Sequence, residues 1–110
     1  MPQPFAPEIF SAESRFGFHL HTSLHFSPDG QEIYFTHQDQ EPLKLTIHVV
    51  KQKDGVWRDP QVAPFSGTYD DNCEMISSDG QRLYFTSNRP LSGSGEPEGE
   101  FGIWFVEREG

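Results

Sequence analysis

The chain has 110 residues and a formal net charge of −9, with 8 Lys and Arg side chains against 17 Asp and Glu. This length suits one ordinary domain, and no Lys/Arg cluster is present, which argues against binding to nucleic acid or to an anionic membrane surface. The single cysteine, Cys73, excludes an internal disulfide, and the aromatic share of 14% predicts a folded chain with an aromatic core.

The N-terminus has neither the basic region nor the apolar region of a secretory signal, and no apolar run is long enough to span a membrane. As written, the chain is expected to be cytoplasmic; it would be periplasmic if it belonged to a longer secreted protein. The Pro-rich stretch at residues 2–7 resembles residues 60–64. We therefore predict an N-terminal segment at residues 1–12 that is a candidate outer strand.

The rest of the chain contains an internal repeat. Residues Phe26–Thr36 and Ile76–Thr86 are identical at seven of eleven positions, with a spacing of 50 residues. This spacing is close to the ~40–50 residues of one four-stranded propeller blade. We predict one repeat unit at residues 13–62 and a second at residues 63–110 that lacks its outer strand.

Each copy of the repeat predicts a hairpin followed by a third strand. Asp-Gly at residues 29–30 and 79–80 is typical of a tight turn, because Gly readily adopts a positive φ. The β-branched and aromatic runs that follow, Ile33–Thr36 and Leu83–Thr86, predict strands. Because these runs are almost continuously apolar, we expect sheets that are covered on both faces.

Further strands are expected after each hairpin. The third strands are predicted at Leu43–Lys51 and Phe101–Arg108, and a fourth at Gly55–Arg58, before Pro60. The second copy offers no fourth strand, so its edge at residues 101–108 is expected to accept residues 2–10 of the same chain or of a neighbouring copy.

The motif Phe-Ser-Pro-Asp-Gly-x-x-Ile-Tyr-Phe, at residues 26–35, resembles the WD40-like repeat of the TolB type. Ser87–Pro90, a Gly-rich loop and residues 102–108 are also similar to that group. The resemblance covers roughly residues 20–110 and implies an all-β fold of about two four-stranded antiparallel β-propeller blades, the second one incomplete, within a larger or oligomeric propeller. Such repeats serve binding, transport complexes and peptidase gating, so the resemblance implies the fold and not one function.

Three histidines form the first group of candidate binding residues. His19, His21 and His25 share parity, so on an extended strand their side chains would point to one face. Imidazoles at alternate positions can chelate zinc or copper. The competing interpretation places hydrogen-bonded or solvated histidines near the central channel of a propeller, with no resident metal, and this is the one we favour.

Asp71 and Glu74 lie in the densest acidic cluster, residues 70–74, and Asp71 aligns with His21 at the spacing of the repeat. Closely packed oxygen ligands can hold calcium, but the spacing does not match an EF-hand loop. The alternative is a polar loop in which Glu74 pairs with Arg89 or with a backbone amide. We predict that His19, His21, Asp71 and Glu74 are binding residues and that the chain needs no metal or cofactor.

No nucleophile–base pair with a third member can be assembled from the sequence, so catalysis is not expected. The acidic loop at residues 92–100 is expected to be a flexible hairpin connection. Trp57 and Trp104 fall inside predicted strands, where a packed core role competes with a sugar-stacking role.

The leading functional expectation is a non-catalytic interaction module that presents an acidic surface to a protein or peptide partner. A blade buries both faces only between neighbours, so self-association into a closed ring is also expected, for example three copies forming six blades. The alternatives are a carbohydrate-binding propeller and an accessory propeller of a hydrolase or peptidase.

Overall fold

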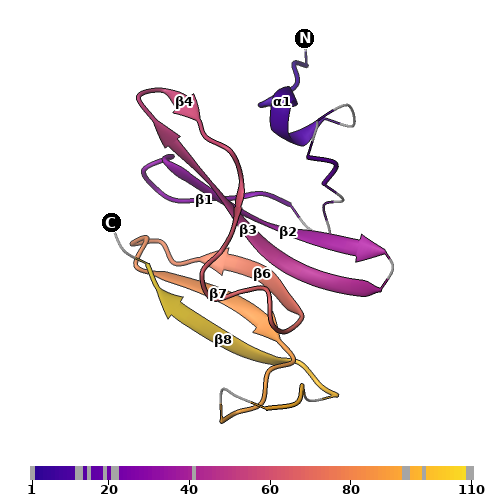
Figure 1. Ribbon diagram of the computed structural model, residues 1–110. Coiled ribbons are helices and arrows are strands. Elements are labelled where there is room, and N and C mark those ends of the chain that lie inside the picture. The colour runs from indigo at the N-terminus through magenta and orange to yellow at the C-terminus, as the bar shows by residue number, and fades with distance from the viewer. Residues whose placement is uncertain are drawn as a thin grey trace.

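The computed structural model describes residues 2–11, 14, 16–18, 20, 23–40, 42–92, 95–97 and 99–108 (Figure 1). These residues form two antiparallel sheets and one short helix, so the predicted all-β class is confirmed. The first sheet contains β1 (His25–Phe26), β2 (Glu32–Gln40), β3 (Leu43–Lys53) and β4 (Val56–Trp57) in that order, and β5 (Gln61–Val62) also pairs with β3. The second sheet contains β6 (Asp71–Ile76), β7 (Arg82–Ser87) and β8 (Gly102–Glu107).

The two sheets are built on the same hairpin corner, as the repeat predicts. In the first corner the Ser27 hydroxyl donates to Asp29 Oδ1 at 2.6 Å, and in the second the Ser77 hydroxyl donates to Asp79 Oδ1 at 2.6 Å. Each aspartate also accepts the backbone N–H two residues later, at 3.0 and 2.9 Å. Because these bonds are local, the same short sequence makes the same turn in both places.

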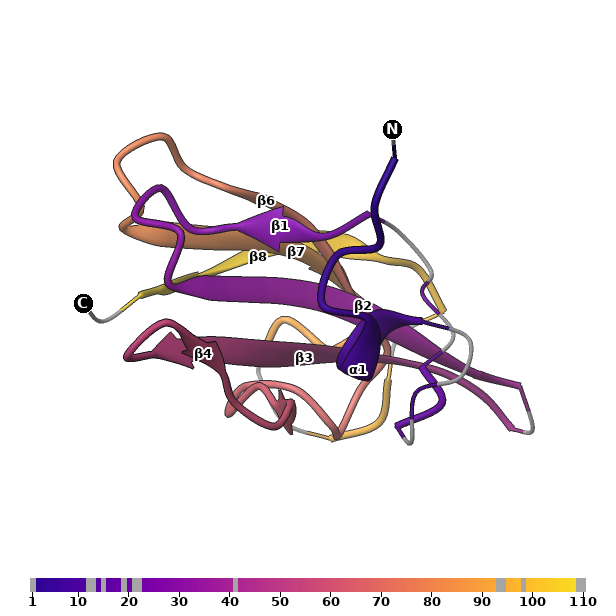
Figure 2. The ribbon, with the colours of Figure 1, turned by 90° about the horizontal axis from the view of Figure 1, so that it is seen from above.

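The two corners are neighbours in space. A Cβ added to Gly80 would lie 3.2 Å from the ring of Pro28, so the turns of the two repeats touch. Figure 2 shows both turns at the same end of the molecule. Arg108, which follows β8, joins the corners: its guanidinium donates to the Gly80 carbonyl and, through Nη2 at 2.7 Å, to Glu32 Oε1. The sheets are therefore stacked with their equivalent ends together.

The first hydrophobic core lies between the two sheets. The first sheet and the segment after it contribute Tyr34, Ile47, Val49 and Ala63, and the second sheet contributes Cys73, Leu83 and Phe85, all of them buried. The Thr36 hydroxyl accepts the backbone N–H of Cys73 at 2.8 Å inside this interface, so the sheets are also joined by a buried hydrogen bond.

A second core covers the opposite face of the first sheet. Ile33, Phe35 and Val50 of the sheet pack against Ile9 of helix α1 (Pro7–Phe10), with partly buried side chains around them. Figure 1 shows the first sheet between α1 and the second sheet. Residues Ile33–Thr36 are consequently buried on both faces, which confirms the expectation for this run. For the equivalent run Leu83–Thr86 the expectation is wrong: Leu83 and Phe85 are buried, whereas Tyr84 and Thr86 lie on a partly exposed face of the second sheet.

The N-terminal segment differs from its expected strand conformation. Residues 7–10 form the helix, and residues 2–6 pair with no strand of the described chain. Proline lacks the N–H that a strand ladder needs, and three of the first seven residues are proline. Phe5 packs its ring against Phe26 and Trp57, at centroid distances of 5.6 and 6.0 Å. The segment is thus held by its aromatic side chains.

The paired corners allow a matched substitution test. Gly30 and Gly80 have φ of +73° and +75°, so Gly30→Ala and Gly80→Ala should each lower the free energy of unfolding by about 1–2 kcal/mol. Only Gly80→Ala adds a methyl group against Pro28 and Arg108, whereas a Cβ at Gly30 would meet no described residue within 4 Å apart from its two chain neighbours. We expect Gly80→Ala to cost roughly 1 kcal/mol more in a urea denaturation experiment. Equal losses would contradict the contact between the corners.

Candidate functional site

The structure describes two of the four predicted binding residues, Asp71 and Glu74, and these two do not share a surface. His19 and His21 lie outside the described residues. Asp71 and Glu74 both belong to β6, but Asp71 is fully buried while Glu74 is exposed. Glu74 accepts hydrogen bonds from Asn72 Nδ2 at 3.1 Å and from the Thr86 hydroxyl at 3.4 Å, on the face directed away from the first sheet.

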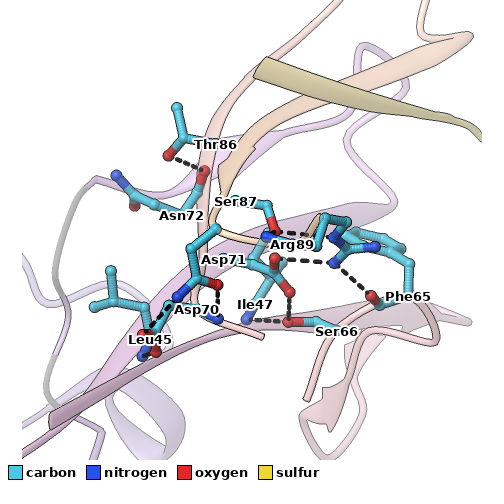
Figure 3. A network of polar contacts seen from close by, with 11 residues as sticks. Leu45, Ile47, Phe65, Ser66, Asp70, Asp71, Asn72, Thr86, Ser87 and Arg89 are labelled. Carbon is cyan, nitrogen blue, oxygen red and sulfur yellow. Dashed lines mark hydrogen bonds and ion pairs between the residues drawn. The ribbon is translucent and has the colours of Figure 1, made fainter. Parts of the chain in front are cut away.

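Asp71 is the centre of a buried polar network (Figure 3). Its Oδ1 accepts a hydrogen bond from Arg89 Nη2 at 2.9 Å, and its Oδ2 accepts one from the Ser66 hydroxyl at 2.8 Å. Ser66 Oγ in turn accepts the N–H of Ile47 on β3 at 3.1 Å. Each carboxylate oxygen is satisfied, as a buried charge requires.

Arg89 completes this network from the segment after β7. Its Nη2 also donates to the Phe65 carbonyl at 3.0 Å, and its Nε donates to the Ser87 hydroxyl at 2.9 Å. The guanidinium lies 5.0 Å from the ring centre of Phe85, within range of a cation–π interaction. The partner of Arg89 is therefore Asp71, and the pairing with Glu74 considered from the sequence does not occur.

Asp70 extends the same connection to the first sheet. Its Oδ1 accepts the N–H of Leu45 on β3 at 3.0 Å (Figure 3). Its backbone N–H donates to Asn88 Oδ1 at 2.9 Å. Among the described residues, no three His, Cys, Asp or Glu side chains are close enough together to hold a metal ion. The network that contains Asp70, Asp71 and Arg89 thus connects the two sheets, and its carboxylates accept hydrogen bonds from protein groups.

Two further titratable groups lie near β6. His25, on β1, is partly buried, and burial lowers its pKa while the negative charge of Glu74 opposes that shift. Its Nε2 is buried and has no hydrogen-bond partner in the part of the chain that the structure describes. Burial raises the pKa of the Cys73 thiol to about 12, so this thiol stays protonated near neutral pH and is a poor nucleophile.

Trp57 and Trp104 lie in strands β4 and β8, as predicted, and both pack against hydrophobic cores. Trp57 packs against the core next to α1, and Trp104 packs against the core between the sheets. Both indole rings are partly buried by these contacts, which agrees with the packed role considered from the sequence.

One candidate interaction surface is the outer face of the second sheet. We define this face by Met75, Tyr84, Ile103 and Phe105. Met75, Ile103 and Phe105 are 53%, 70% and 47% exposed. Tyr84 and Phe105 are cross-strand neighbours with ring centres 5.8 Å apart, and Arg82 lies over the Phe105 ring at 4.3 Å. An apolar sheet face of this kind normally marks an interaction surface.

The second feature is the cleft between the sheets, with a volume of about 460 Å³. Val49, Phe65 and Val106 give it an apolar lining, and Glu32 and Arg108 are charged residues at its wall. The cleft borders the outer edge of β8, the edge that pairs with no strand among the described residues. The open edge could be predicted from the sequence, but the cleft could not, because its walls come from both repeats.

Comparison with known proteins adds no relative: no family model, no curated protein and no solved structure matches the chain. The helix in the described part of the chain is too short to cross a membrane.

Proposed function

We propose that the chain is a non-catalytic β-propeller repeat module that acts as a protein–protein interaction scaffold. The order β1-β2-β3-β4 of consecutive antiparallel strands is that of a propeller blade, and β6-β7-β8 repeats its first three strands. The motif that resembles the TolB-type repeat occupies the same corner in both sheets. The shared strand order and the stacking of the two sheets support this interpretation.

One observation carries the proposal: equivalent faces of the two sheets have different environments. Tyr34 of the first sheet is buried against the second sheet, whereas Tyr84, which occupies the equivalent position in the second sheet, lies on the exposed outer face. The stacking that buries the Tyr34 face would bury the Tyr84 face if a third sheet were added in the same way.

A further sheet of the same type is the partner that fits the outer face. Another copy of the chain can supply it, and successive head-to-tail contacts of this kind can close into a ring. The apolar character of β8, which carries Ile103, Trp104, Phe105 and Val106, favours association over a free surface.

Self-association through the outer face is the experimental test. We expect the sedimentation coefficient of the chain to rise with concentration, and the double substitution Met75→Ser and Phe105→Ser to abolish that rise. Leu91→Ser is the matched control, because Leu91 is 88% exposed and lies outside the outer face. A wild-type chain that stays monomeric at every concentration, or a double variant that associates like the wild type, would overturn the proposal.

A further inference from the structure

We infer that the open edge of β8 and the adjacent cleft bind an extended polypeptide segment whose large aromatic side chain lies opposite Arg108. This inference rests on the proposed interaction function and identifies the chemistry of a partner. It comes from an internal template, because the first sheet already binds such a segment at the edge that corresponds to β8.

Backbone hydrogen bonds establish which residues of the two sheets correspond. Gln52 donates its N–H to the Gln31 carbonyl at 2.7 Å, and Arg108 donates its N–H to the Gln81 carbonyl at 2.6 Å. Gln31 and Gln81 are equivalent residues of the repeat, so Arg108 in the second sheet corresponds to Gln52 in the first. Two residues earlier, Val106 corresponds to Val50 in the same way.

In the first sheet, the outer edge of β3 is occupied by the segment that contains β4 and β5. The Lys51 carbonyl accepts the N–H of Arg58 at 2.8 Å, and the Ile47 carbonyl accepts the N–H of Ala63 at 2.9 Å. The equivalent residues of β8 are Glu107 and Ile103. No strand pairs with this edge of β8 in the described residues, so its backbone groups are open to a partner.

Trp57 is the large side chain that the added segment contributes to the first sheet, on the face that α1 covers. It lies opposite Gln52 in the pairing of β3 with β4, and it packs beside Val50 in the core next to α1. The same position on a segment added to β8 lies opposite Arg108 and beside Val106. Both of these residues line the cleft, so the cleft is where the equivalent of Trp57 would insert its ring.

The guanidinium of Arg108 is placed where it could contact an aromatic side chain of an added segment. Its side chain is 8% exposed, and its guanidinium lies 5.9 Å from the ring centre of Tyr34. A second aromatic ring on the side of the guanidinium away from Tyr34 would make a second cation–π contact with Arg108. The Arg108 Nε is buried without a hydrogen-bond partner among the described residues, and the carbonyl groups of an added segment could provide an acceptor.

The probe is a fluorescently labelled synthetic peptide with the sequence of residues 54–63, the segment that covers the edge of β3. We expect saturable binding to the full chain by fluorescence anisotropy, because strand addition supplies main-chain hydrogen bonds and the cleft accepts an alternate side chain. A peptide carrying Trp57→Ala should bind roughly tenfold more weakly or worse. A Val56→Ala peptide is the control and should bind within about twofold of the original, since the side chain before Trp57 faces away from the cleft.

A pair of substitutions in the protein tests strand pairing separately. The amide of Glu107 is directed to the open edge, because the next amide, that of Arg108, donates to the Gln81 carbonyl just before β7 and successive amides of a strand point in opposite directions. Glu107→Pro removes this donor, and proline is tolerated at an edge strand. Glu107→Ala loses the same carboxylate but keeps the amide. We expect Glu107→Pro to weaken peptide binding at least about tenfold and Glu107→Ala to change it little.

Equal affinity of the Trp57→Ala peptide and the original would overturn the aromatic site, and equal affinity of the Glu107→Pro and Glu107→Ala proteins would overturn strand pairing. Absence of saturable binding would overturn both. The Met75→Ser and Phe105→Ser protein should bind the peptide normally, because those side chains lie on the outer face. The peptide site and the proposed outer-face contact can therefore fail independently.

Discussion

Replacing Asp71 with alanine is expected to lower the free energy of unfolding by about 3–5 kcal/mol, because it leaves the Arg89 guanidinium without its carboxylate partner. Asp71 is fully buried and the Arg89 side chain is 15% exposed, so water offers little compensation. The substitution also removes the acceptor of the Ser66 hydroxyl. Urea denaturation followed by circular dichroism measures the loss.

Glu74→Ala is the matched control for that experiment, since Glu74 is an exposed carboxylate on the same strand. Its effect should stay within about 0.5 kcal/mol. A double-mutant cycle that adds Arg89→Met should show strong coupling between positions 71 and 89, because each charge is costly only when the other is removed. A loss for Asp71→Ala no larger than that for Glu74→Ala would contradict the importance of the buried pair.

Phe85→Ala should lower the free energy of unfolding by a similar amount, about 3–5 kcal/mol. Phe85 is 1% exposed and lies in the core between the two sheets, with its ring centre 5.0 Å from that of Phe65. The substitution removes apolar surface from this interface and leaves a cavity that rigid sheets cannot fill. Such a loss is a large part of the ~5–15 kcal/mol that stabilises a typical domain.

Phe101→Ala is the comparison, because Phe101 is 50% exposed just before β8. We expect it to cost less than about 1 kcal/mol in the same denaturation assay, with an unchanged dependence on denaturant. If the two phenylalanine substitutions had equal effects, the interface between the sheets would not be the main core of the molecule.

The hairpin corners and most strands were predictable from the sequence because their interactions are local. Ser77, Asp79 and the next backbone amide lie within a few residues of each other, so the same letters produce the same turn in both repeats. The third strand of the second copy was predicted at Phe101–Arg108 and is observed at Gly102–Glu107. That Arg89 pairs with Asp71 and not with Glu74 was not predictable, because it depends on which face of β6 packs against the first sheet.

The order of the strands, the two Asp-Gly turns and the nearly continuous apolar run Ile33–Thr36 of β2 were determined by the sequence itself, through turn chemistry and side-chain pattern. Only the tertiary structure decided which faces of the two sheets are covered and that a cleft borders the open edge of β8. It also decided that the N-terminal segment forms α1 and not the expected strand. The reason is distance along the chain: Arg108 and Glu32 are separated by 76 residues and meet only when the two sheets stack. Contacts of that separation depend on how whole sheets pack, which no local pattern encodes.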